Sequence, residues 1–244
     1  MFIRYRTSGI FLEKEDKREA DRLFTVYTKD FGKIKVLAKA IRKINSKLRS
    51  GTELFYLSEI EFVQGKIYKT LIDVVLIDNF KNIRSDLNKI EIVFQIAELL
   101  DKLILEQEKD EQIWNLLNET FYKLNNLSLS SSLLYYYFFW NLISILGYKP
   151  NLYNCLVCQN KLEPFDFYLN SEQGGIICEN CVRNIKNELD LKKMIRISPD
   201  TIKILRLFLN KNWLVLEKLR IEKFCMELLE LIFKDYLSYI LKNL

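Results

Sequence analysis

The chain has 244 residues and a formal net charge of +5, and 49% of its residues are apolar and 28% charged. These proportions are those of ordinary globular proteins and exclude a disordered or collagen-like chain. Histidine is absent, which excludes histidine-dependent catalytic triads, imidazole general bases and two-histidine metal motifs.

Residues 1–80 carry the patterns of short β-strands. In the run 33–38, Lys33 and Lys35 alternate with Ile34 and Val36, which is the period of a half-buried strand. The other expected strands cover residues 9–12, 23–28, 54–63 and 66–75, with a charged loop at 13–19 and turns at 29–32 and 64–65. Five short antiparallel strands of this length suit a small barrel, and an OB-fold is the natural candidate.

From about residue 79 the hydrophobic period becomes that of α-helices. Apolar stripes predict helices at 90–103, 113–124, about 128–147 and 221–240, with Phe94 on the buried stripe of the first. Ser198, Pro199 and Asp200 predict another helix start, because they supply a capping serine, a proline in the first turn and an acid near the positive end.

The segment between Lys123 and Lys149 is uncharged, and its most apolar part, residues 133–146, is 14 residues long. A membrane span needs about 20 predominantly apolar residues, so a buried core helix is the better interpretation. Residues 1–7 are not followed by the apolar core of a signal peptide. We therefore expect a cytoplasmic protein without a membrane segment.

Four of the five cysteines form two C-x2-C pairs separated by 19 residues, namely Cys155, Cys158, Cys178 and Cys181. This spacing is typical of a four-cysteine zinc ribbon. A strand at 165–169, a turn at Gly174-Gly175 and a return strand at 176–177 would bring the pairs together. Four protein ligands leave no open position, so the predicted Zn²⁺, one per chain, is structural. The alternative is a set of redox-active or merely buried thiols; Cys225 is expected in the core.

The predicted fold is α+β and multidomain. It consists of an N-terminal OB-fold β-barrel at residues 1–80, an α-helical bundle at 81–150 and 186–244, and an inserted four-cysteine zinc hairpin at 151–185.

The main electrostatic feature is a run without acidic residues, from Phe31 to Thr52. Residues 1–80 hold 16 Lys and Arg against 11 Asp and Glu, which accounts for the whole net charge, since residues 81–244 sum to zero. Charge runs are often solvated faces, but those normally mix signs, and a basic loop beside a barrel strand is where OB-folds take single-stranded nucleic acid. The predicted nucleic-acid-binding residues in this run are Lys33, Lys35, Lys39, Arg42, Lys43, Lys47 and Arg49.

Nearby aromatic side chains could stack on bases, although each is more often a core residue: Phe24, Tyr27, Phe31, Phe55 and Tyr56.

Three motifs of the N-terminal third, in this order, resemble those of the bacterial recombination mediator RecO. They are Glu19–Leu23 (EADRL), Thr28–Lys33 (TKDFGK), and Ala38–Lys43 (AKAIRK) followed by Ser46–Arg49 (SKLR). Ala40 stands where the family usually has Gly. Arg22, in the first motif, joins the predicted DNA-binding residues. The whole layout of OB-fold, helical domain and cysteine insertion also resembles that family.

The resemblance implies binding of single- and double-stranded DNA and annealing of complementary strands. It also implies assembly with RecR to load recombinase onto DNA coated by single-stranded-DNA-binding protein, whose acidic C-terminal tail would contact the helical domain. A protein of this kind is a nucleoid-associated mediator and not an enzyme.

Two other functions compete with this interpretation. An RNA-binding or ribosome-associated module can also combine an OB-fold with a zinc ribbon. A metal-dependent nuclease or hydrolase is disfavoured because histidine is absent, the cysteine site is closed, and no short carboxylate motif is present to hold two metals.

Overall fold

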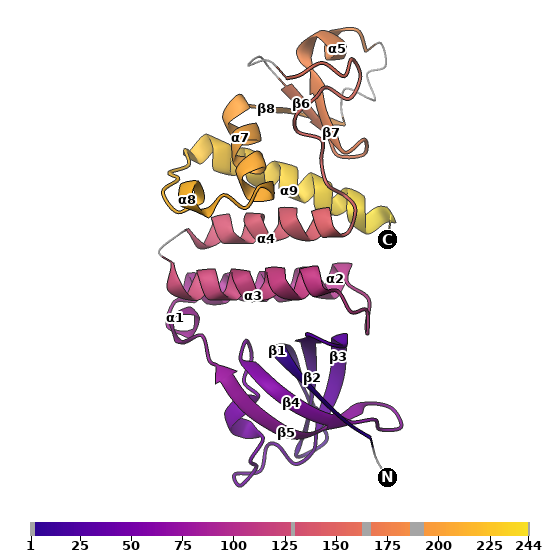
Figure 1. Ribbon diagram of the computed structural model, residues 1–244, viewed down its shortest axis with the longest axis vertical. Coiled ribbons are helices and arrows are strands. Elements are labelled where there is room, and N and C mark those ends of the chain that lie inside the picture. The colour runs from indigo at the N-terminus through magenta and orange to yellow at the C-terminus, as the bar shows by residue number, and fades with distance from the viewer. Residues whose placement is uncertain (1–2, 128–129, 163–166, 186–192, 244) are drawn as a thin grey trace. The chain divides into compact units, whose positions relative to one another are not determined.

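In the computed structural model the chain forms two compact units, Met1–Leu127 and Ser128–Leu244. The structure describes residues 3–127, 130–162, 167–185 and 193–243. The first unit contains a β-barrel followed by three helices, so these helices group with the barrel (Figure 1). The second unit contains the remaining helices and a small sheet.

The barrel is closed and has five strands in the order β1-β2-β3-β5-β4, as an OB-like fold requires. β1 pairs with both β2 and β4, and the short parallel pairing of β3 with β5 completes the circle. The strands are β1 (Arg4–Lys17), β2 (Asp21–Thr28), β3 (Gly32–Ala38), β4 (Leu57–Val63) and β5 (Lys69–Asp78). The predicted barrel is confirmed.

The alternation seen in the sequence determines which side chains fill the barrel. Ile34 and Val36 of β3 and Ile60 and Phe62 of β4 belong to its buried core, whereas Lys35 of β3 is exposed. Because successive side chains of a strand point to opposite faces, a one-residue slip would expose this whole set.

The predicted charged loop at 13–19 is wrong over most of its length. β1 continues to Lys17, and Glu13, Lys14, Glu15, Asp16 and Lys17 each pair with a residue of β2. Charged residues are tolerated there because this half of the strand faces solvent. Only residues 18–20 form the turn into β2.

Three helices follow the barrel: α1 (Lys81–Arg84), α2 (Leu87–Leu103) and α3 (Glu111–Asn126). The Asp86 and Asp110 side chains accept hydrogen bonds from the first backbone N–H groups of α2 and α3, which satisfies otherwise unpaired donors. The predicted stripes are confirmed for both helices except at Phe94, which is 50% exposed, and Ile90, which is half-buried.

The second unit contains α4 (Ser131–Ile145), α5 (Glu179–Arg183), α7 (Pro199–Leu209), α8 (Trp213–Leu216) and α9 (Lys223–Asn243). α4 is buried along most of its length, and α7 begins at the predicted Ser198 cap, whose hydroxyl accepts a hydrogen bond from the Thr201 N–H. Cys225 is buried on α9, as predicted. Among the helices in the described part of the chain, none combines the length and apolarity needed to cross a membrane.

Candidate nucleic-acid interface and candidate metal centre

The loop between β3 and β4, residues 39–52, is packed onto the barrel at two apolar side chains. Ile41 is 3% exposed and belongs to the barrel core, and Leu48 packs against the same core. The Thr52 hydroxyl donates to the Leu48 carbonyl over 2.9 Å, next to the single 3-10 turn η1 (Arg49–Gly51). The loop therefore has a defined course, and its Lys and Arg side chains are exposed.

The start of the loop depends on the EADRL motif. The Ala40 N–H donates to the Asp21 carboxylate over 2.8 Å, and the Arg42 N–H donates to the Ala20 carbonyl over 3.1 Å. Ala40 has a φ of +54°, in the left-handed region that favours glycine. The loop keeps this conformation although the position holds alanine, and Asp21 acts as a structural residue of the motif.

Four loop cations are exposed and have no ion-pair partner among the described residues. These are Lys39, Lys43, Lys47 and Arg49. Arg42 is also exposed, and its guanidinium lies 3.7 Å from the Asp16 carboxylate. Five positive charges thus lie on one short loop, against the carboxylates of Asp16 beside Arg42 and of Asp21 at Ala40, which leaves a local positive potential.

Arg22 lies next to this loop but is already paired. Its Nε donates to Asp16 over 2.6 Å. This hydrogen bond, together with the charges of Arg22 and Arg42, holds the pKa of Asp16 below its usual range. Asp16 therefore joins Arg22 and Arg42 at the border of the loop.

Lys33 does not lie with the loop cations, and its prediction as a phosphate contact is corrected. Its side chain is only 6% exposed. The ammonium donates to the Asp101 carboxylate at 3.0 Å and to the carbonyls of Asp101 and Leu100 at 2.9 and 3.4 Å. An ammonium has three N–H donors, so no donor is left for a phosphate. Because the carbonyls belong to the last turn of α2, the helix dipole also favours the cation.

The TKDFGK motif that contains Lys33 forms the turn between β2 and β3. It also packs against the residues that follow α2. The Thr28 hydroxyl donates to the Gly32 carbonyl at 2.9 Å and accepts from the Phe31 N–H at 3.1 Å. Gly32 has a φ of +62°, and a Cβ there would lie 2.1 Å from the Glu108 carbonyl oxygen. Only glycine fits this close approach. The motif in the sequence indicated a tight turn at Gly32, but the contact of Gly32 and Lys33 with residues 106–108 is long-range and could not be predicted from it.

Lys35 is 44% exposed at its side chain, but Glu106 lies 2.8 Å from its ammonium. The hydrogen bond to Glu106 raises the pKa of Lys35, so the lysine remains charged and paired. β3 therefore offers no unpaired cation, whereas the loop after it offers four.

The aromatic residues proposed for base stacking lie mainly in the core. Phe24, Tyr27 and Phe55 are at most 5% exposed. Phe31 packs edge-on against Tyr5 and Phe62. Phe31 and Tyr56 are half-buried and pack against the barrel core, and the Arg84 guanidinium lies 4.9 Å from the centroid of the Tyr56 ring.

The second candidate site is the cysteine cluster of the second unit. β6 (Phe167–Asn170) and β7 (Gly175–Cys178) form the predicted hairpin, and β8 (Met194–Ile197), which was not predicted, pairs with β6 on its other side. The four Sγ atoms of Cys155, Cys158, Cys178 and Cys181 lie within 4.8 Å of one another. The hairpin therefore brings the two C-x2-C pairs together, as expected.

The distances fit a single tetrahedral ion. Metal–sulfur bonds of about 2.3 Å in tetrahedral geometry separate the sulfur atoms by roughly 3.8 Å, and the Cys158 and Cys178 Sγ atoms are 3.9 Å apart. The cluster could thus hold a metal ion with all four thiols as ligands.

The surroundings of Cys155 favour its thiolate form. Its burial raises the thiol pKa, but backbone N–H groups of Cys178, Cys158 and Val157 point at the sulfur and lower the pKa to about 6. The Cys178 N–H lies 3.4 Å from that sulfur. Burial and the neighbouring thiols raise the pKa of Cys178 and Cys181, so these hydrogen bonds favour the thiolate at Cys155 alone.

Known proteins resemble the chain along its whole length. The model of the N-terminal domain of recombination protein O matches residues 1–80, and the model of its C-terminal domain matches residues 84–243.

Several full-length relatives carry the name DNA repair protein RecO. The protein of Dehalococcoides mccartyi is 33% identical over 239 residues, which cover 98% of this chain and 91% of the relative. Proteins of the same name from Thermoanaerobacter sp. and Roseiflexus sp. are 28% and 29% identical over 234 and 240 residues. These matches cover 96% and 98% of this chain and 91% and 82% of the two relatives.

Proposed function

Since this chain belongs to the RecO family, we propose that it is a DNA-repair mediator of homologous recombination. In this role it binds single- and double-stranded DNA, anneals complementary strands, and helps load recombinase onto DNA coated by single-stranded-DNA-binding protein. In this proposal the protein binds and positions DNA strands and partner proteins. No residue is assigned a catalytic role.

The observation that carries the DNA-binding part is the set of unpaired cations on the loop of a closed barrel. The proposed contacts are now Lys39, Arg42, Lys43, Lys47 and Arg49, with Arg22 at the border. Lys33 and Lys35 are removed from the set because they lie on β3 and not on the loop, and because their ammonium groups bind Asp101 and Glu106. Contacts of this kind reach phosphates and tolerate any base sequence.

Annealing is consistent with this arrangement. Two complementary strands repel each other through their phosphates, and a dense row of cations lowers that repulsion while leaving base edges free. An RNA-binding role is not favoured, because relatives of the same family are named for DNA repair.

The partner part of the proposal rests on the family alone. RecR and the acidic C-terminal tail of the single-stranded-DNA-binding protein are the proposed partners, and the α-helical part of the chain is the proposed site for the tail. A protein that acts on chromosomal DNA in this way works at the nucleoid, in the cytoplasm, and this is the proposed location.

We also propose that the cysteine cluster binds one structural Zn²⁺. Four thiolates with tetrahedral separations suit zinc and leave no open coordination position for catalysis. The apolar core around Cys155 is small and includes Ile177 and Val182. Bound metal would therefore add much of the stability of the small sheet.

The decisive experiment measures annealing of complementary strands coated with single-stranded-DNA-binding protein, with and without RecR. The double variant Arg42→Glu/Lys43→Glu is expected to lose annealing while keeping its circular dichroism spectrum. The control Lys81→Glu/Lys102→Glu has the same net charge change at exposed lysines outside the loop and is expected to anneal normally. Unchanged annealing by the loop variant would refute the proposed contacts, and equal displacement of DNA by RNA would refute DNA as the substrate.

The zinc proposal has its own test. Metal analysis of the purified protein is expected to give one zinc per chain, released by a chelator under mild denaturant with a lower melting temperature. Cys158→Ser is expected to weaken retention of zinc, whereas Cys225→Ser is not. A carefully purified chain without any metal would contradict the proposal.

A further inference from the structure

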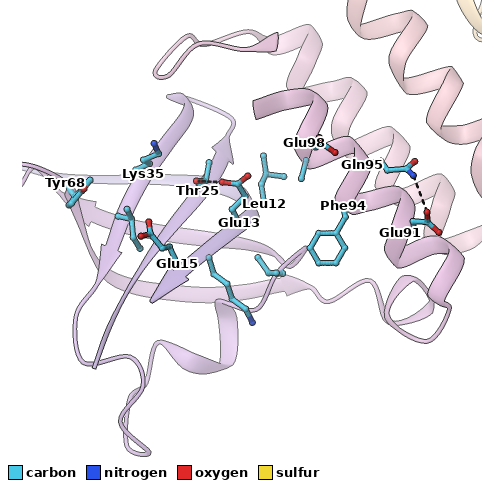
Figure 2. Close-up of a pocket in the computed structure, with 14 residues that line it drawn as sticks. Leu12, Glu13, Glu15, Thr25, Lys35, Tyr68, Glu91, Phe94, Gln95 and Glu98 are labelled. Carbon is cyan, nitrogen blue, oxygen red and sulfur yellow. Dashed lines mark hydrogen bonds between the residues drawn. The ribbon is translucent and has the colours of Figure 1, made fainter. Parts of the chain in front are cut away.

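A groove of about 740 Å³ lies in the first unit between the outer surface of β1, β2 and β3 and the helix α2. Figure 2 shows Phe94 pointing from α2 toward the strand residues, and Glu91, Gln95 and Glu98 of the same helix also line the groove. None of the five loop cations lines it. The groove is therefore a surface separate from the proposed DNA contacts.

The floor of the groove is apolar. Leu12, Leu23 and Ala97 line it and are nearly fully buried beneath it. Phe94 stands at the side with 50% of its surface exposed, held edge-on against the buried Phe55 ring at 4.7 Å between centroids. A helix of this kind normally buries an aromatic ring on its apolar stripe, so this exposed ring is available to an incoming apolar side chain.

The rim of the groove is acidic, unlike the loop that carries the five cations. Four carboxylates line it, from Glu13, Glu15, Glu91 and Glu98, against the two ammonium groups of Lys14 and Lys35, which leaves an excess of two negative charges. Glu15 and Glu98 are paired with Lys17 at 2.5 Å and Lys102 at 2.6 Å, so Glu13 and Glu91 are the rim carboxylates without an ion pair among the described residues. Both lysines already lie beside other carboxylates: Lys14 is 3.4 Å from Glu53, and Lys35 is 2.8 Å from Glu106. Residues 1–80 as a whole carry +5.

From this charge complementarity we infer that the groove docks a basic, amphipathic segment of a partner protein. An apolar side chain of that segment would pack beside Phe94 and over the leucine floor, and its Lys or Arg side chains would meet the glutamates. Helices laid in apolar grooves are recognised in this way. DNA phosphates and an acidic protein tail are both repelled by the same rim, so this surface serves another partner.

A synthetic peptide tests the inference on the full-length protein. The probe is a 16-residue helical peptide of Lys and Leu, with Leu on one face, and the control peptide has Glu in place of every Lys. Fluorescence anisotropy is expected to show salt-sensitive binding of the Lys peptide and none of the Glu peptide. Glu91→Lys/Glu98→Lys is expected to weaken the binding at least tenfold, and the uncharged change Phe94→Ala by several-fold.

Matched variants separate a site from a general charge effect. Glu222→Lys/Glu227→Lys changes the net charge equally in the second unit and is expected to leave peptide affinity within twofold of the wild type. The loop variant Arg42→Glu/Lys43→Glu should lose DNA but keep the peptide, whereas the groove variant should keep DNA. Melting curves verify that each variant is folded.

Three results would overturn the inference. One is equal peptide binding by the groove variant and the wild type, and another is binding of the Glu peptide as tightly as the Lys peptide. The third is concentration-dependent self-association, seen by light scattering, that Glu91→Lys/Glu98→Lys abolishes, because it would assign the groove to a second copy of this chain.

Discussion

The cations of β3 and the cations of the loop that follows it belong to one acid-free run, yet their environments differ completely. Lys33 is buried and uses its three donors on the end of α2, and Lys35 is paired with Glu106. Lys39, Lys43, Lys47 and Arg49 are exposed, without an ion-pair partner among the residues that the structure describes.

This contrast shows that the number of phosphate contacts cannot be taken from the number of positive charges in a run. A cation can meet a phosphate only when its donors are free and the surrounding potential is positive. The β3 lysines meet neither condition, because residues 101 and 106 supply carboxylates from the segment at the end of α2. Acids distant in sequence pair with two of the seven cations of the run, and the other five lie on the loop.

The largest expected effect removes the loop charges. Replacing Lys39, Lys43, Lys47 and Arg49 by Gln should lower affinity for single-stranded DNA about 100-fold or more at low salt, because four phosphate contacts are lost. With all five loop cations in contact, log K should fall against log salt with a slope of about −3.5, and the variant should lose about 2.8 of that slope. Anisotropy titrations over a range of salt measure both values. A slope unaffected by the four changes would remove the distinction between the two regions.

Lys33→Met is expected to affect stability instead of DNA binding. The change leaves the Leu100 and Asp101 carbonyls without their charged donor, which should lower the free energy of unfolding by about 2 kcal/mol. Urea denaturation measures this, and Lys43→Met in the exposed loop serves as the control with little expected change. If Lys33→Met were as stable as the wild type but bound DNA more weakly, the assignment of Lys33 to the fold would be wrong.

Ala40→Gly tests the junction between the two regions. Because Ala40 has a φ of +54°, glycine should relieve backbone strain and stabilise the protein by about 1 kcal/mol. Ala38→Gly, in the last residue of β3, should destabilise it instead. Thermal melts distinguish these outcomes, and a loss of stability in Ala40→Gly would contradict a strained, defined loop.

The smallest effect is expected for Lys35→Met. An exposed ion pair contributes less than about 1 kcal/mol, and a paired lysine beside an acidic groove should add little to DNA binding. Affinity within twofold of the wild type is the expected result of the same titration. A tenfold loss would return Lys35 to the DNA-binding set.

Local patterns were sufficient to predict much of this protein. Alternating side chains in β3 and β4, the Ser198 cap and the spacing of the four cysteines are short-range signals, because each depends on neighbours a few residues away. They predicted the barrel, the helices and the cysteine cluster, and the acid-free run marked the loop that carries the exposed cations.

Tertiary structure decided what each charge and ring does. The pairing of β1 with β2 made a strand of a charged segment, α2 buried Lys33, and Phe94 became a half-exposed wall of an acidic groove. Each of these outcomes depends on an element tens of residues away, and burial and ion pairing follow from distances in space. The sequence determines the signs of the charges, and the fold determines which of them remain free to bind a partner.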